Sequence, residues 1–136
     1  MITQQIGVKA IIEKDNKILL IKRSAAYGEI SNSWDIPGGR TEFGEEPEEG
    51  LKREIKEETG LELETIKLVL DVSTVFKNQE KQIIRVTYLC TVKNNNIQLS
   101  HEHTDMQWIT KQELKNIEFK DKILKKTISL FSNLYS

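Results

Sequence analysis

The sequence predicts a single α/β domain, and three observations support this fold class. Two long strand-like runs, at about Leu63 to Phe76 and Gln82 to Val92, follow a helix-like segment at about Pro47 to Thr59. A second amphipathic helix is predicted near the C-terminus. A length of 136 residues suits one hydrophobic core but not two, so residues 1–136 are expected to form one domain.

The N-terminal part of the chain predicts a hairpin and a short extended piece. Apolar runs at Val8 to Glu13 and Lys17 to Arg23 are separated by Lys14-Asp15-Asn16, which is typical of a tight turn. After a polar loop, Trp34-Asp35-Ile36 is expected to be extended and to lead into Pro37-Gly38-Gly39.

The C-terminal part predicts one more strand and two helices. Met106 to Ile109 is the strand, and Thr110 follows as an N-cap with Glu113 completing a capping box for a short helix. The last helix is predicted from apolar and small residues at helical spacing, namely Ile123, Leu124, Thr127, Ile128, Phe131 and Leu134.

The helix predicted at Pro47 to Thr59 has a recognisable start and end. Pro47 suits the first helical position, with Glu46 as the N-cap, and Gly60 suits the left-handed position after the last turn. Gly50 is unusual inside a helix, because glycine there costs about 1 kcal/mol relative to alanine. Close packing of the backbone would explain it.

Three carboxylates, Glu54, Glu57 and Glu58, lie three and four residues apart on this helix. One interpretation is a solvated acidic face. Helical geometry argues against it, because at about 100° per residue Glu58 lies only about 40° from the centre of the stripe formed by Leu51 and Ile55. On the same count Glu54 lies about 80° and Glu57 about 140° from that centre.

A desolvated carboxylate needs a partner, and a metal ion would supply one. Clustered carboxylate oxygens are the ligands that Mg²⁺ or Mn²⁺ prefers, with positions left for water and substrate phosphates. Arg53, one turn before Glu57, is expected to pair with it. The segment therefore predicts a divalent-metal site for phosphate chemistry.

The stretch from residue 39 to 61 resembles the box of the Nudix family, G-x5-E-x7-R-E-U-x-E-E-x-G-U, where U is a bulky aliphatic residue. Seven fixed positions, each at the roughly 7% average usage of glycine, would coincide by chance with odds on the order of 10⁻⁸. The pattern is filled at every specified position by Gly39, Glu45, Arg53, Glu54, Ile55, Glu57, Glu58, Gly60 and Leu61.

The resemblance implies an α/β/α sandwich with a mixed β-sheet between helices, and Mg²⁺-dependent hydrolysis of a phosphoanhydride bond. It implies that Glu54, Glu57 and Glu58 ligate the metal with the backbone carbonyl of Gly39. Arg53 would orient the acids. Glu45 would support the junction between loop and helix.

The general base has two candidates, Glu58 and a downstream glutamate, because members of the family differ in this residue. The downstream residue is predicted to be Glu102, as an additional catalytic or metal-binding acid. His101 and His103 beside it are interpreted as loop residues rather than a zinc pair, since no further ligand completes a tetrahedral set.

Arg23 and Arg40 are the candidates for contact with substrate phosphates, because arginine matches the geometry of phosphate oxygens. Trp34 and Phe76 could stack on a base, although a place in the core or at its rim is the ordinary expectation for each.

Substrate choice rests on positions outside the box. The marks of ADP-ribose, diadenosine polyphosphate, NADH and coenzyme A hydrolases are missing, which leaves a MutT-type enzyme that converts a (d)NTP to the monophosphate and pyrophosphate. ADP-ribose or a nucleotide sugar is the alternative substrate. An RNA 5′-end pyrophosphohydrolase and a non-catalytic, nucleotide-sensing Nudix domain are the other hypotheses, and the intact carboxylates argue against the sensor.

Composition narrows the partners. Residues 39 to 61 contain eight Glu and four Lys or Arg, so the remainder carries a formal charge of +3 within a chain of net charge −1. This balance does not predict duplex nucleic-acid binding. The chain has one cysteine, Cys90, which is expected to be buried. Lacking a membrane-span or signal-peptide pattern, the protein is expected to be cytoplasmic, as a monomer or homodimer.

Overall fold

The fold is that of a computed structural model, which describes residues 1–23, 33–94 and 103–134. The side chains of Arg23, His103 and Thr104 are not among the described parts. In chain order the elements are β1 (Thr3–Lys14), β2 (Lys17–Arg23), β3 (Trp34–Asp35), β4 (Gly38–Arg40), α1 (Pro47–Thr59), β5 (Leu63–Phe76), β6 (Lys81–Val92), β7 (His103–Thr110), α2 (Lys111–Leu114) and α3 (Lys122–Asn133).

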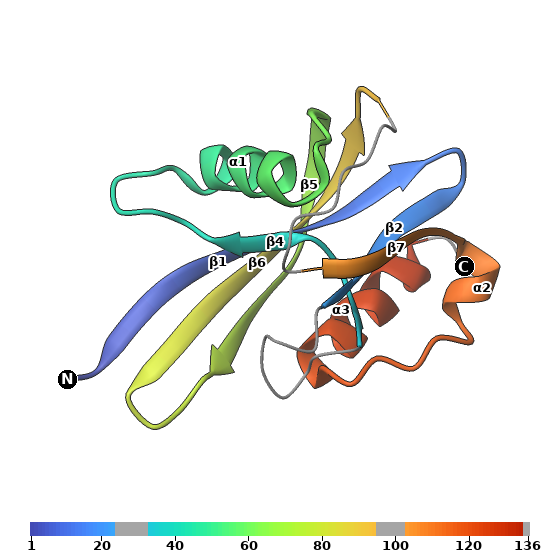
Figure 1. Cartoon of the computed structure of the whole chain (residues 1–136). Coiled ribbons are helices and arrows are strands. Elements are labelled where there is room, and N and C mark those ends of the chain that lie inside the picture. Colours follow the sequence, from blue (N-terminus) through green and yellow to red (C-terminus); the bar gives the residue numbers. More distant parts are fainter. Residues whose placement is uncertain (24–32, 95–102, 135–136) are drawn as a thin grey trace.

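The strands form a mixed sheet with β1 at its centre (Figure 1). β1 runs parallel to β6 from Thr3 opposite Lys81 to Glu13 opposite Thr91, whereas β2, β4 and β5 pair with their neighbours in the antiparallel sense. The order along the main path is β3-β2-β1-β6-β5, with β4 added to β1 and β7 to β2. The predicted mixed sheet is confirmed.

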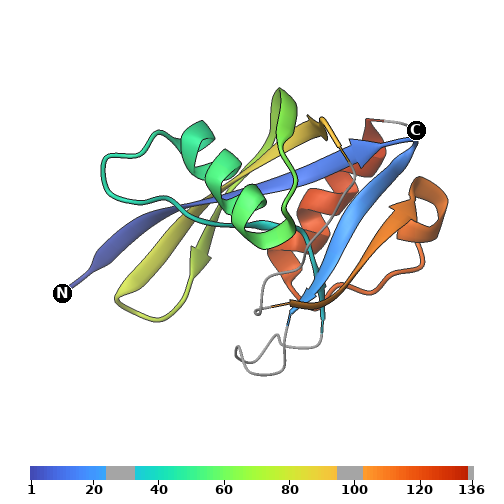
Figure 2. The same cartoon turned by 45° about the horizontal axis from the view of Figure 1, so that its top comes forward.

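Helices cover both faces of this sheet (Figure 2). On one face Leu51 and Ile55 of α1 pack with Val8, Ala10 and Ile12 of β1. On the other face Leu124, Ile128 and Phe131 of α3 pack in one cluster with strand residues. These strand residues include Ile11 of β1, Leu20 of β2 and Leu89 of β6. A strand that is buried on both sides is therefore apolar at consecutive positions, as β1 is.

Local signals placed several element ends correctly. Asp15 and Asn16 both have positive φ, 52° and 63°, as the two-residue turn of a hairpin requires. Gly60 is left-handed at φ 75°, and its N–H donates to the carbonyl of Lys56. In the predicted capping box at the start of α2, the Thr110 hydroxyl accepts from the Glu113 N–H at 3.1 Å.

Two predicted strands were too short. β1 begins at Thr3 rather than Val8, because its polar first residues are held by pairing with β6 and not by burial. β7 runs from His103 rather than Met106, because it pairs with β2 as far as Arg23. Cys90 is buried, as predicted. Among the described helices, none is long and apolar enough to cross a membrane.

Candidate active site

Helix α1 exposes its three acids to very different degrees. Glu58 is only 6% exposed, and the side chains of Glu54 and Glu57 are 17% and 59% exposed. This order follows the angles predicted from the sequence, because Glu58 lies nearest the stripe of Leu51 and Ile55. The cluster thus joins the buried face of the helix to solvent.

Arg53 holds the acids together. Its Nε and Nη2 donate to the two oxygens of Glu45 at 2.8 and 3.0 Å, a bidentate pair. Its Nη1 donates to Glu54 at 2.9 Å and to Glu57 at 3.3 Å, and Nη2 also donates to the backbone carbonyl of Arg40 at 3.0 Å. One guanidinium therefore ties the loop after β4 to two turns of α1.

Glu45 is the strongest partner of this arginine. Its carboxylate also accepts from the backbone N–H of Glu42 at 2.9 Å, which closes the loop just before α1. The hydrogen bond from Arg53 and then the bond from Glu42 lower the pKa of Glu45 to about 2. The pKa of Arg53 is raised, first by its bond to Glu45. Both groups are therefore charged at neutral pH.

Two glycines of β4 allow the acids to approach the strand. A Cβ built on Gly39 would overlap the carboxylate of Glu54, so only glycine leaves room for that side chain against the backbone. A Cβ on Gly38 would overlap the backbone of Val8 and Lys9. The N–H of Gly38 donates to Oε1 of Glu58 at 3.3 Å. These contacts set the Gly-Gly pair directly against α1.

Burial dominates the titration of Glu58. Loss of hydration raises its pKa to about 9, the neighbouring Glu54 raises it further, and the charge of Lys9 opposes the shift. In the metal-free protein Glu58 therefore carries a proton at neutral pH. A cation at this position would favour the ionised form instead.

The residues present fit a hard divalent cation. The space that a Cβ of Gly39 would fill is occupied by a carboxylate, and the neighbouring donors are carboxylate oxygens, the ligand type of Mg²⁺. Within residues 1–23, 33–94 and 103–134, no three acidic, His or Cys side chains are already arranged as a metal cage. Glu54 and Glu57 instead point their oxygens at Arg53.

The other predicted site residues divide into two groups. Arg40 ends β4 with an exposed side chain, and its backbone carbonyl accepts from Arg53. Glu102, His101 and the side chains of Arg23 and His103 lie outside the described residues. Of the two aromatic candidates, Trp34 is half-buried with Lys22 Nζ 5.5 Å from its ring centre, and Phe76 is 72% exposed.

Two ion pairs near β4 have no signal in the sequence. Lys9 donates to Asp35 at 2.8 Å and to the carbonyl of Ile36 at 3.2 Å. Arg85 donates to Asp121, the N-cap of α3, at 3.1 Å. The partners are 26 and 36 positions apart. The order of the strands brings the first pair together, and the packing of α3 on the sheet brings the second pair together.

Comparison with known proteins gives several relatives. The chain is 34% identical over 122 residues to an ADP-ribose pyrophosphatase of Methanocaldococcus jannaschii, covering 88% of this chain and 70% of that protein. It is 29% identical to nucleoside triphosphatase NudI of Enterobacter sp., covering 87% and 90% of the two chains. It is 31% identical to a MutT-like protein of Streptomyces ambofaciens, over 76% of this chain but only 62% of that protein.

The fold has a close counterpart among solved structures. The MutT protein from Methanosarcina mazei Go1 superposes with a TM-score of 0.84 and 25% identity, over 99% of this chain and 97% of that one. The model of the NUDIX domain matches residues 3–131. With the sandwich fold and the helix of clustered acids, these matches show that the chain belongs to the Nudix family of pyrophosphohydrolases.

Proposed function

We propose that this protein hydrolyses a nucleoside triphosphate to the monophosphate and pyrophosphate, in a reaction that depends on Mg²⁺ and for which Mn²⁺ can substitute. The observation that carries the proposal is the set of intact acids on α1, tied by Arg53 to Glu45 and seated against Gly38 and Gly39. Similarity to nucleoside triphosphatase NudI supports the substrate class.

Glu54, Glu57 and Glu58, with the backbone carbonyl of Gly39, would hold the metal. When bound, a divalent cation neutralises charge on phosphoryl oxygens and makes a water molecule more acidic. Arg53 would keep Glu54 and Glu57 on the same side of α1, and the Gly38 N–H would hold one oxygen of Glu58. Arg40 and Arg23 are the proposed phosphate contacts.

The reaction consumes one water molecule. Its oxygen forms a bond to phosphorus, the anhydride P–O bond breaks, and the electron pair of that bond leaves with the departing phosphate group. A carboxylate must take the proton of the water. Glu58 in its ionised form and Glu102 are the two candidates for this base.

An ADP-ribose or nucleotide-sugar pyrophosphatase is the second candidate function. It is favoured by 34% identity to an ADP-ribose pyrophosphatase over most of both chains. The same acids would perform the same bond cleavage, so the two candidates differ only in what the reacting diphosphate carries. A sensor without activity would not need the complete set of acids.

The test is product analysis with Mg²⁺ across (d)NTPs, ADP-ribose and nucleotide sugars, with a variant Glu54→Gln as the control for contaminating activity. Pyrophosphate together with a monophosphate from one or more triphosphates is the expected result. Turnover of only ADP-ribose or a nucleotide sugar would mean that this compound, and not a nucleoside triphosphate, is the substrate. Tight nucleotide binding without turnover of any compound would contradict catalysis.

A further inference from the structure

A small pocket on the far side of β4 is lined by basic residues. Gly38 and Gly39, which contact the acids of α1 from one side, also line this pocket. Its other walls come from β1, β6 and the turn after β5, and its volume is about 120 Å³. Among the described residues, nine line the pocket and none of these is acidic; four of the nine are cationic, namely Lys9, Arg40, Lys77 and Arg85.

Strand register explains why the pocket exists. Gly7 of β1 lies opposite Arg40 on one side and Arg85 on the other. Residues that pair across neighbouring strands point to the same face of a sheet, so the missing side chain of Gly7 leaves a gap between two arginines. A Cβ at Gly7 would lie 2.9 Å from Cγ2 of Ile83 and would narrow that gap.

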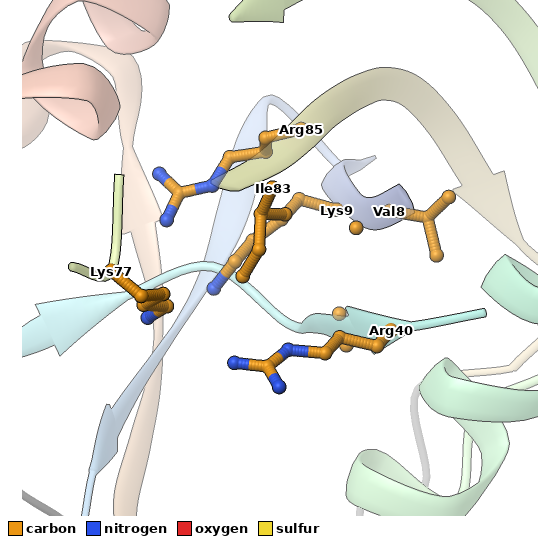
Figure 3. Close-up of a pocket in the computed structure, with 9 residues that line it drawn as sticks. Val8, Lys9, Arg40, Lys77, Ile83 and Arg85 are labelled. Atoms are coloured by element: carbon orange, nitrogen blue, oxygen red, sulfur yellow. The ribbon is translucent and has the colours of Figure 1, made fainter. Parts of the chain in front are cut away.

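The cationic groups point into a common space. Figure 3 shows the ends of Lys9, Arg40, Lys77 and Arg85 turned toward the same side of the pocket. Lys9 and Arg85 are mostly buried and are fixed by Asp35 and Asp121, with side-chain exposures of 14% and 12%. Arg40, from β4, and Lys77, from the turn after β5, are exposed. Two fixed donors and two exposed cations thus surround one small volume.

The size and chemistry of the pocket select its ligand. A volume of about 120 Å³ is well below the roughly 300–1,000 Å³ of sites for larger organic ligands, so a base with its ribose does not fit. None of the lining residues that the structure describes is aromatic, so these walls offer a base no ring to stack on. Lysine and arginine donors match a compact oxyanion such as a phosphate group.

We propose that this pocket binds a phosphate-class oxyanion, and that during the reaction the oxyanion is the terminal phosphate of a nucleoside triphosphate. The second half of the proposal rests on the proposed function; the first half does not. Because β4 separates the pocket from the acids by a single strand, a triphosphate whose reacting linkage lies at Gly39 extends its remaining phosphates over this edge strand. The pocket thereby favours triphosphates over substrates with an uncharged group at that end.

Binding is tested with inorganic phosphate in EDTA at constant ionic strength, followed by amide chemical shifts. Saturable shifts are expected at Gly7, Lys9 and Gly38. The double variant Arg40→Gln/Lys77→Gln should weaken binding about tenfold, since hydrogen bonds to charged groups are lost, while both exposed positions leave folding intact. Lys122→Gln/Lys125→Gln, which also removes two exposed positive charges, both on α3, is the matched control.

Equal phosphate binding by Arg40→Gln/Lys77→Gln and by the control, or chemical shifts that do not saturate, would overturn the proposal that the pocket binds phosphate.

The second half of the proposal, that the pocket holds the terminal phosphate of the substrate, is tested by steady-state kinetics. In Lys77→Gln, which leaves the proposed phosphate contact Arg40 in place, the KM for the triphosphate should rise several-fold, and the KM for a nucleotide sugar should change much less. Phosphate binding with an unchanged KM would assign the pocket to free phosphate instead. Phosphate binding without any hydrolysis would refute the proposed function and leave the pocket standing.

Discussion

Glu57 is the acid of the cluster that extends furthest into solvent, at 59% side-chain exposure. Glutamine at this position keeps the shape but removes the charge that would hold a cation. Glu57→Gln is expected to lower kcat by about 100-fold or more, as the loss of one electrostatic contact to a reacting centre commonly does. Steady-state kinetics with Mg²⁺ measure the effect.

Glu64→Gln, an exposed change on β5, is the control for Glu57→Gln. Thermal denaturation should show Glu57→Gln as stable as the parent or more stable, because the variant relieves repulsion from Glu54, three residues before it on the helix. A variant that unfolds, with unchanged activity for each folded molecule, would mean that the acids serve the structure alone.

Glu58 makes the stability of the metal-free protein depend on pH. Burial raises its pKa from 4.5 to about 9, so between these values the folded protein binds more protons than the unfolded chain. Stability from this group is complete below about pH 4.5 and is lost as the pH rises toward 9. Unfolding in EDTA across this range should show the decline, and Glu58→Gln should flatten it. An equal slope in both proteins would contradict the assignment.

Helix α1 carries a glycine that its neighbours require. A Cβ at Gly50 would lie 2.8 Å from Oε1 of Glu45 and 2.9 Å from Cγ2 of Thr41, and that glutamate is already fixed by Arg53. Gly50→Ala gains about 1 kcal/mol of helix propensity but displaces Glu45. Activity is therefore expected to fall several-fold without unfolding, measured beside exposed Lys52→Ala. Full activity in Gly50→Ala would show that Glu45 moves freely.

Helix α3 is attached to the sheet through its first residue. Asp121 accepts from the N–H groups of Ile123 and Leu124 at 2.9 and 3.1 Å and from Arg85 at 3.1 Å. Asp121→Ala loses both the cap and the ion pair and should destabilise the protein by about 2 to 4 kcal/mol in urea unfolding. Asp121→Asn keeps the cap and should lose less. Equal losses would show that the cap contributes nothing.

At the scale of the whole molecule, the sequence predicted what is local. The bounds of α1 follow from Pro47 and Gly60, and the burial of Glu58 follows from its angle to Leu51. These signals lie within a few turns of one helix, where geometry is fixed by 3.6 residues per turn. Motif and structure therefore agree on where the acids lie.

Long-range pairing could not be predicted in the same way. The parallel ladder of β1 and β6 joins residues about seventy-eight positions apart, and nothing in either strand names its partner. The ion pair of Lys9 with Asp35 depends on the order of β1, β2 and β3, and the pair of Arg85 with Asp121 depends on the packing of α3 against the sheet. The basic pocket, built from four separate segments, was therefore invisible until the strands were placed.

A Mn²⁺ titration followed by electron paramagnetic resonance tests most directly whether Glu54, Glu57 and Glu58 hold a divalent cation. The parent protein is expected to bind Mn²⁺ with loss of the free-ion signal, and excess Mg²⁺ should restore that signal by competition. The double variant Glu54→Gln/Glu57→Gln should leave the free-ion signal unchanged. Equal Mn²⁺ binding by parent and double variant would contradict the assignment of the metal to these acids.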